Sequence, residues 1–351
     1  MKRRPRFKSL WVTQNGQSPA AARKKTQGPA KSEHGPVRKY QSSDIDIVDY
    51  QYEVLDGCSF AVRGPLSGNP SAKNIVCLGS AATFGRFAKK PFPAVLAERL
   101  GVHVMNFGIG GARPETYLKE PELLKKCRQS DLIILELMSA RSYESDLFIP
   151  GGHQGKTGRV GPRYAEQIAA TGDRVLLEKP IVSADQLYKW AVGHLDEPSL
   201  AEIRRQILDC YVRDAQNLIE QVQKPVILLW LSQRSMDEVP ERESYRTWAR
   251  GFPHFVDRQA VEAIETRAVG LVNVTSSAGI PSPLISFRTG EPVSIRRERW
   301  KPTTSNSYYP SPEMHLEAAE KILTFLETLP GNSWARSAEP PPAGLQPAGL
   351  Q

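Results

Sequence analysis

Four short segments of the sequence place an arginine among small residues, a combination suited to binding an anion. Glycine, alanine and serine let a ligand approach the backbone, and the guanidinium group offers a fork of donors that fits carboxylate, phosphate or sulfate. The structural alternative is that these arginines form ion pairs with nearby acids such as Glu115 and Glu144. The segments are 79–86, 108–113, 138–142 and 232–235, with Arg86, Arg113, Arg141 and Arg234.

A histidine near the end of the chain has the position of a candidate general base. His315 follows Ser311 and Pro312, which are typical of the first positions of a helix. Glu313 precedes it by two residues and could orient its ring. A histidine in the first turn of a helix can equally be a polar residue at the edge of the core, and both interpretations stay open at this point.

Apolar runs that end in the arginine segments predict the strands of one sheet. Helical patterns lie between these runs, and strands that alternate with helices favour a parallel sheet with helices on both faces. In such open sheets, ligands bind beyond the carboxyl ends of the strands, where the four segments lie. Strands are expected near 74–78, 102–107, 131–136 and 226–231, with a weaker one at 270–276.

Helical patterns between the predicted strands show where the α/β alternation holds and where it is interrupted. The clearest helix is 199–223, where Ser199 and Glu202 have the spacing of a capping box. Pro121 should break a helical stretch at 114–127. Residues 142–198 do not follow the alternation and are interpreted as an insertion. The sequence thus predicts a three-layer α/β/α domain, mainly parallel and flavodoxin-like in topology, over about 44–329.

The net charge of +8 belongs to one end of the chain. Residues 1–43 hold eleven Lys and Arg and a single acid, Glu33. Their low apolar content predicts a disordered basic tail, with weak, salt-sensitive attraction to polyanions. Residues 330–351 are Pro-rich and repeat the pentapeptide PAGLQ, which indicates a second disordered tail.

Several classes of function receive no support from the sequence. No apolar run reaches the roughly 18 residues of a membrane span, so no transmembrane segment is expected. The four cysteines, none in a CxxC pair, indicate free thiols in a reducing cytoplasm. No Cys or His pair has the spacing of a zinc site, so neither a metal nor another cofactor is expected. The cysteines are Cys58, Cys77, Cys127 and Cys210.

The order of the segments resembles the SGNH (GDSL-type) hydrolases over about 73–140 and, less closely, 305–329. That family begins with a strand ending in Gly-Asp-Ser, which corresponds here to 79–81. Its Asn-x-Gly-x-x-Gly motif, whose last glycine helps to form the oxyanion hole, corresponds to 106–111. Its Glu-Leu-x-x-Asn-Asp and Asp-x-x-His motifs correspond to 136–141 and 312–315. Residues 83–87 and 91–93 also resemble an uncharacterised bacterial family of this superfamily.

The departures from the family pattern decide the expected chemistry. The nucleophile position is Ala81, the oxyanion asparagine position is Ala140, and the aspartate position is Pro312. Of the four signature roles of the family, only those at Gly111 and His315 keep their residue types, so ordinary ester hydrolysis is not expected. The predicted catalytic candidates are His315, Thr83 and Ser80. The predicted substrate-binding residues are Gly79, Gly111, Asn106, Arg86, Arg113, Ser139, Arg141 and Glu313.

Two functions follow from this pattern. In the first, the protein transfers an acyl or sulfuryl group to a carbohydrate, with His315 as general base and the arginines holding an anionic group of the substrate. In the second, the same scaffold is a non-catalytic protein that binds an anion or glycan. A third hypothesis makes the domain an adaptor whose basic tail contacts the partner.

Overall fold

A seven-stranded sheet lies at the centre of the computed structural model, which describes residues 50–66, 73–151, 157–178, 181–295, 302–329 and 334. Both predicted tails lie outside these residues, apart from residue 334. The strand order is β1-β2-β4-β3-β5-β9-β10, and the last five strands are parallel neighbours. They are β4 (His103–Gly108), β3 (Asn74–Gly79), β5 (Leu132–Glu136), β9 (Val226–Ser232) and β10 (Gly270–Thr275).

The order of the parallel strands is that of a flavodoxin-like sheet, so the predicted fold class is confirmed. Two strands escaped prediction because each is only three residues long: β1 (Tyr52–Val54) and β2 (Ala61–Arg63). β2 pairs antiparallel with β4, and β1 pairs antiparallel with β2 at the edge of the sheet. All residues of β5 and β9 are buried, as expected of strands that helices cover on both faces.

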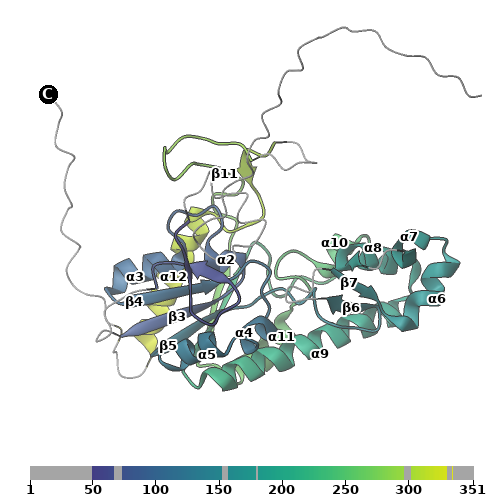
Figure 1. The fold of residues 1–351 in the computed structure, drawn as a ribbon, viewed down its shortest axis with the longest axis horizontal. Coiled ribbons are helices and arrows are strands. Elements are labelled where there is room, and N and C mark those ends of the chain that lie inside the picture. The colour runs from purple at the N-terminus through teal and green to yellow at the C-terminus, as the bar shows by residue number, and fades with distance from the viewer. Residues whose placement is uncertain are drawn as a thin grey trace, which may run out of the picture. The chain divides into compact units, whose positions relative to one another are not determined.

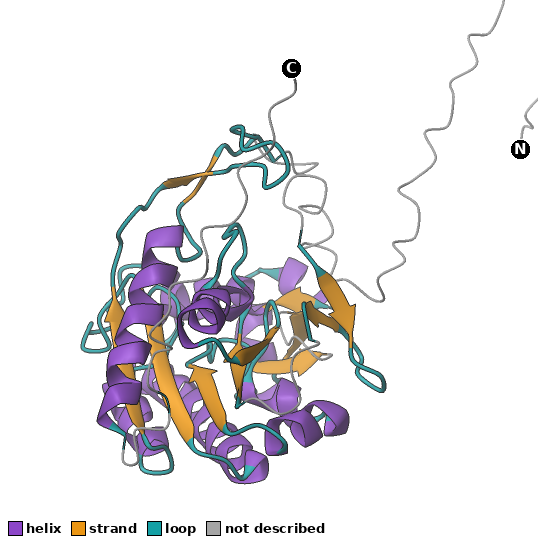
Figure 2. Ribbon diagram, turned by 90° about the vertical axis from the view of Figure 1, so that its left-hand side faces the viewer, coloured by secondary structure: helices purple, strands orange, loops and turns teal. Residues whose placement is uncertain are grey.

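Alternate residues of the parallel strands belong to separate hydrophobic cores. Val76 and Leu78 of β3 face one core, and Ile75 and Cys77 face the other, following the two-residue period of a strand. α3 (Phe92–Leu100) and α12 (Pro312–Thr328) cover one face of the sheet. The opposite face is covered by α4 (Pro114–Leu118), α5 (Pro121–Arg128), α9 (Glu197–Val222) and α11 (Arg258–Glu265). Figure 1 and Figure 2 show this layering from two sides.

Caps explain where several helices begin and end. α4 and α5 are separate helices that divide before Pro121, as predicted. The capping box expected at Ser199 is wrong: α9 begins two residues earlier, and the carboxylate of Asp196 accepts the Ser199 N–H at 2.9 Å. The hydroxyl of Ser311 caps α12 as expected, by accepting the Met314 N–H at 3.1 Å.

A second, three-stranded antiparallel sheet occupies the segment that breaks the alternation. Tyr188 in this segment packs edge-on against Trp248 and Phe255 at 5.8 and 5.3 Å, so the segment shares the core of α9. Its elements are β6 (Phe148–Gly151), β7 (Thr157–Val160), β8 (Val182–Ser183), α6 (Pro162–Ala170), α7 (Arg174–Glu178) and α8 (Ala184–His194). The remaining elements are α2 (Ala81–Phe84), α10 (Tyr245–Ala249), β11 (Ser282–Pro283) and β12 (Ser305–Asn306).

Among the described residues, no helix combines the length and the apolar character that crossing a membrane requires.

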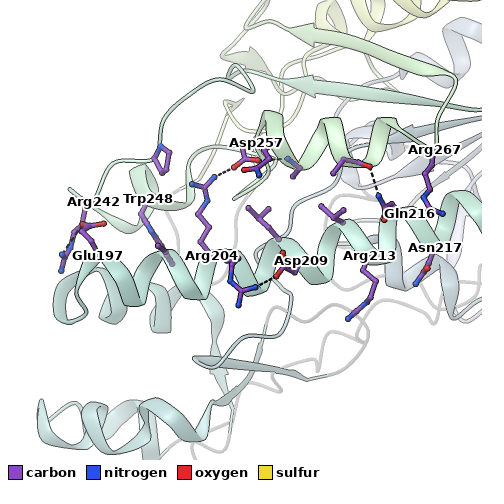
Figure 3. A pocket seen from close by; sticks show the side chains of 18 of the residues that line it. Glu197, Arg204, Asp209, Arg213, Gln216, Asn217, Arg242, Trp248, Asp257 and Arg267 are labelled. Carbon is purple, nitrogen blue, oxygen red and sulfur yellow. Dashed lines mark hydrogen bonds and ion pairs between the residues drawn. The ribbon is translucent and has the colours of Figure 1, made fainter.

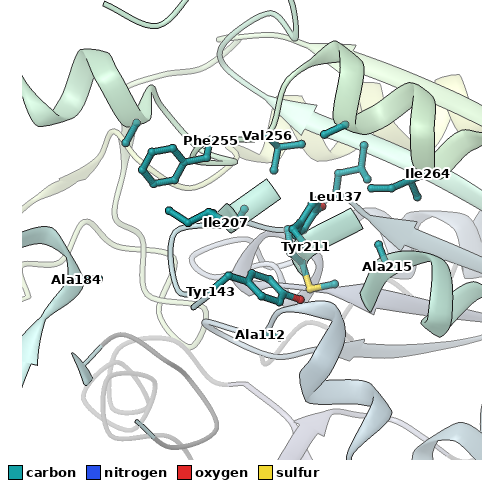
Figure 4. Packing of buried hydrophobic residues seen from close by; sticks show 14 of the residues in the cluster. Ala112, Leu137, Tyr143, Ala184, Ile207, Tyr211, Ala215, Phe255, Val256 and Ile264 are labelled. Carbon is teal, nitrogen blue, oxygen red and sulfur yellow. The ribbon is translucent and has the colours of Figure 1, made fainter. Parts of the chain in front are cut away.

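Buried hydrophobic side chains fill the core between α9, α11 and the sheet (Figure 4). Ile207 of α9 is fully buried there. We expect Ile207→Ala to lower the free energy of unfolding by about 2–5 kcal/mol, because it leaves a cavity. Leu316→Ala on α12 is the control, since Leu316 is 50% exposed, and it should change the value by less than about 0.5 kcal/mol. Urea unfolding measures both; equal effects would contradict the assignment of the core.

Candidate functional site

A cavity of about 230 Å³ lies beyond the carboxyl ends of β3, β4 and β5, where ligands bind in sheets of this type. We call it the strand-end cavity. Three of its walls are the loops that follow these strands, and the fourth comes from two later segments. It is lined by Ser80, Ala81, Ala82, Gly111, Ala112, Arg113, Ser139, Arg141, Ser142, Phe252, Tyr308, Tyr309 and Pro310.

Five of the residues predicted from the sequence meet in this cavity: Ser80, Gly111, Arg113, Ser139 and Arg141. Gly111 has a φ of 78°, a left-handed conformation that glycine adopts without steric cost. The loop after β4 can therefore turn sharply and form the cavity wall with backbone. The other six predicted residues, Gly79, Thr83, Arg86, Asn106, Glu313 and His315, do not line the cavity.

The carboxylate of Glu136 holds the turn between β3 and α2. It is fully buried at the end of β5 and accepts from the Ser80 N–H at 3.0 Å, the Ser80 hydroxyl at 2.6 Å and the Thr83 N–H at 2.7 Å. The Thr83 hydroxyl donates to it as well. Burial raises the pKa of Glu136, and these hydrogen bonds oppose the rise. Both hydroxyls that were predicted as catalytic therefore have a carboxylate as their partner.

Two further predicted residues support this turn from behind. The amide of Asn106 donates to the Thr83 carbonyl at 2.8 Å and accepts from the Gly108 N–H at 2.9 Å. The N–H of Gly79 donates to the hydroxyl of Tyr117 at 2.9 Å. A Cβ at position 79 would collide with the side chains of Thr83 and Glu136. These contacts give Asn106 and Gly79 a role in holding the turn in place.

His315 is buried in the core and not at the cavity. Its Nδ1 accepts from the Phe92 N–H at 3.3 Å, and its ring stacks on Phe92 with the centroids 6.2 Å apart. Burial, followed by the positive charge of Arg63, lowers the pKa of His315 to about 3. Glu313 is exposed, and its carboxylate lies against the backbone of Gly279. The structure thus places this pair outside the cavity.

The segment that reaches the cavity before α12 is 306–309 and not 312–315. Tyr308 and Tyr309 line the cavity, and the side chain of Asn306 binds their backbone. Its Oδ1 accepts from the N–H groups of both tyrosines, at 3.1 and 2.9 Å, and its Nδ2 donates to the Tyr309 carbonyl at 2.8 Å. The sequence carries no catalytic motif at Asn306 or Tyr309, so the place of this segment at the cavity is seen only in the structure.

The four strand-end arginines have different roles. Arg86 is buried, and its guanidinium donates to the Tyr309 hydroxyl at 2.7 Å. Arg113 donates to the Ser142 carbonyl and forms an ion pair with Glu115, as the structural alternative proposed. Arg234 lies outside the cavity and donates to four backbone carbonyl oxygens.

Arg141 is the cavity arginine with the weakest ion pair. Its ion-pair partner is a carboxylate oxygen of Asp185, 3.7 Å away. That same oxygen accepts the Tyr245 hydroxyl at 2.7 Å, and the Asp185 side chain is 48% exposed. An exposed pair of this kind has little energy, so a bound anion can compete with Asp185 for the guanidinium.

A histidine that no motif indicated stands beside the cavity. Nδ1 of His254 is 3.1 Å from the hydroxyl of Ser139. Burial, and then the positive charges of Arg141 and Arg234, lower the pKa of His254 well below its usual range. His254 lies between two apolar positions of a loop, far from any strand pattern, so only the three-dimensional structure brings it to Ser139.

A larger groove of about 650 Å³ runs along α9 (Figure 3). It is rich in arginine, but four of its arginines are paired with carboxylates that also line the groove. The pairs are Arg204–Asp257, Arg205–Asp209, Arg242–Glu197 and Arg267–Glu220. Because each of these guanidinium groups already has a carboxylate, the groove is a weaker candidate for an anion than the strand-end cavity.

Comparison with known families finds a match over most of the domain. A family model described as "Domain of unknown function (DUF6473)" matches residues 38–149 and 191–329. The unmatched stretch between these parts lies in the segment that forms the three-stranded sheet. No curated protein matches the chain.

Solved structures with detectable similarity include a G-D-S-L family protein, an esterase and a lipase. A G-D-S-L family protein from Desulfitobacterium hafniense DCB-2 is 14% identical, with a TM-score of 0.35, over 71% of this chain and 97% of that chain. An acetylxylan esterase from Geobacillus stearothermophilus is 12% identical, with a TM-score of 0.34, over 72% and 93%. A lipase from a goat rumen metagenome is 13% identical, with a TM-score of 0.33, over 75% and 98%. The strand order and the positions of the motifs are similar to those of the SGNH fold.

The burial of His315 predicts a specific response to acid. Its pKa is about 3 in the folded protein and near 6.5 in an unfolded chain, so the unfolded state binds more protons between these values. The free energy of unfolding should therefore fall as the pH is lowered from 7 to about 5.

We expect His315→Leu to make this fall shallower by up to about one bound proton. The variant loses the acceptor for the Phe92 N–H, so it should also be less stable at pH 7. Urea unfolding at several pH values measures both effects. His194→Gln, at an exposed position on α8, serves as the control and should keep the parental slope. An unchanged slope in His315→Leu would show that this ring is not the buried neutral group.

Proposed function

The chain belongs to the family described as "Domain of unknown function (DUF6473)", and we propose that its strand-end cavity binds a small molecule or glycan that carries an anionic group. The proposal rests mainly on the position of Arg141 and on its weak ion pair. It lines the cavity, and its nearest carboxylate is a half-exposed one at 3.7 Å. A guanidinium group in this state has donors to offer an incoming carboxylate, phosphate or sulfate.

The charge around the cavity also favours an anion. The SGNH motif has an aspartate at the position of Arg141, so a negative charge is replaced by a positive one. Arg113 adds a second guanidinium at the wall, but Glu115 balances it. No carboxylate lines the cavity among the residues described. The local formal charge is therefore positive, which attracts an anion to a partly water-excluded site.

The remaining walls suit an organic ligand of modest size. Ala81, Ala82 and Ala112 leave room beside the backbone, and Phe252 with Tyr308 provides flat apolar surface. A mainly apolar pocket with a few polar groups is typical of small-molecule sites. This combination supports a ligand that has both an anionic group and a ring or chain, such as a sugar acid or a sulfated or phosphorylated sugar.

We propose binding and not catalysis by the SGNH mechanism, because the catalytic groups of the SGNH pattern are not assembled in this chain. Position 81 is alanine, the Ser80 and Thr83 hydroxyls donate to Glu136, and His315 lies in the core. Transfer of an acyl or sulfuryl group needs a base at the cavity. A function limited to binding an anion or a glycan needs none.

We expect sulfate, inorganic phosphate or a sugar acid to raise the melting temperature and to give a measurable Kd by calorimetry. Arg141→Ala should weaken binding by about tenfold to a hundredfold, because a charge-assisted hydrogen bond contributes about 1.5–3 kcal/mol. Arg205→Ala in the groove along α9 should bind like the parent, since Arg205 is exposed and pairs with Glu202 and Asp209.

Two results would refute the proposal. One is the absence of any response to these anions at millimolar concentration. The other is an Arg141→Ala variant that binds as tightly as the parental protein while remaining folded.

A further inference from the structure

A serine hydroxyl and a neutral imidazole meet at the wall of the strand-end cavity. Oγ of Ser139 lies 3.1 Å from Nδ1 of His254, within the reach required of a nucleophile and its general base. The hydroxyl lines the cavity, whereas the ring is buried behind it. The backbone N–H of Arg141 points at the same Oγ at 3.4 Å, so the oxygen that would lose a proton has a donor beside it.

We propose that Ser139 and His254 are a relocated nucleophile and general base, and that the cavity transfers acyl groups through Ser139. This pair uses neither the serine position nor the histidine position of the SGNH pattern. It occupies the loop after β5 and the loop before α11. The identity of an anionic substrate rests on the function proposed above; the pairing of the two side chains does not.

The loop that carries His254 is held rigidly. The carbonyl of His254 accepts from the Ala140 N–H at 3.1 Å, which ties it to the residue after Ser139. Arg234 and Arg250, both buried, donate to carbonyl oxygens on either side of the histidine. Arg250 and Phe255 have φ values of 61° and 67°, a conformation that surrounding contacts must enforce. A base fixed in this way needs little reorganisation before reaction.

The charges around His254 connect the base to the substrate. The groups that act on it are Arg141 and Arg234, and together with burial they keep the ring neutral. With the proton on Nε2, Nδ1 is free to accept the hydroxyl proton. An anionic group bound to Arg141 would cancel one of the two positive charges. The proton affinity of His254 would then rise when the substrate is in place.

The transfer balances without any further reactant. The Ser139 oxygen forms a bond to the acyl carbon of a donor ester, and the bond from that carbon to the leaving oxygen breaks. His254 takes the hydroxyl proton and passes it to the leaving oxygen. A sugar hydroxyl or water then attacks the acyl–serine ester, His254 takes its proton, and that proton returns to Oγ of Ser139 as the ester bond breaks.

The test is covalent labelling of the full chain with phenylmethylsulfonyl fluoride, which is uncharged and so does not need Arg141. Attack by the serine oxygen forms an O–S bond, breaks the S–F bond and releases fluoride and the proton. Intact-mass measurement should show one adduct, and peptide mapping should place it on Ser139. Ser139→Ala should remove the adduct, and His254→Gln should slow labelling by about a hundredfold or more.

Controls separate chemistry from folding. His194→Gln, on the surface of α8, should label at the parental rate, and melting curves should show that each variant is folded. Because the pKa of His254 lies well below the usual value for imidazole, its ring should stay neutral at pH 6. The parental labelling rate should therefore stay level as the pH falls from 7.5 to about 6. A rate that halves near pH 6.5 would contradict a buried neutral base.

The outcomes distinguish this inference from the proposed function. Labelling of Ser80 or Thr83, or none in a folded protein that still binds sulfate through Arg141, would overturn the nucleophile and leave the binding proposal standing. Labelling of Ser139 that depends on His254, in a protein with no affinity for anions, would support the nucleophile and refute the anionic substrate.

Discussion

The buried carboxylate of Glu136 fixes the centre of this molecule. A charge or proton enclosed at the end of β5 is stable only if its oxygens are well bonded, and here Ser80 and Thr83 each supply an N–H and a hydroxyl. Glycine at position 79 is what lets the turn come this close. The interaction locks β3, α2 and β5 into one unit. It also occupies the hydroxyls of Ser80 and Thr83, which flank Ala81 in the sequence, as hydrogen-bond donors to Glu136.

Because these hydroxyls are bonded to Glu136, the side chains available at the cavity come from other loops. With the β3 turn serving as scaffold, the groups left to act lie on the β5 loop: Ser139, with His254 behind it, and Arg141. The other arginines support the walls. Arg86 binds Tyr309, Arg113 binds the Ser142 carbonyl and Glu115, and Arg234 holds the His254 loop. Arg113 and Arg141 both line the cavity, and Arg141 is the one with the weaker ion pair.

The parallel strands were predicted well because a strand that helices cover on both faces needs apolar residues at nearly every position. β5 and β9 are apolar at almost every position, and Gly79 and Gly108 end their strands beside the cavity. It missed β1 and β2, whose three residues are too few to show a period. The site was predicted only in part. Whether an arginine side chain donates to backbone carbonyls or faces the cavity depends on residues far away in the sequence. The Ser139–His254 contact likewise joins residues 115 positions apart. His315 was predicted as a general base because its position before a helix resembles that of the family histidine, but its ring lies in the core against Phe92.

We propose that an anion binds beside Arg141 and the Ser139 loop. Crystals of the protein soaked in selenate would test this directly, because anomalous scattering from selenium locates the ion without ambiguity. We expect a selenium peak in the strand-end cavity, with selenate oxygens within hydrogen-bond distance of the Arg141 guanidinium and near Ser139 and Gly111. A cavity without such a peak, with Arg141 paired to Asp185, or a peak only at surface lysines, would contradict it.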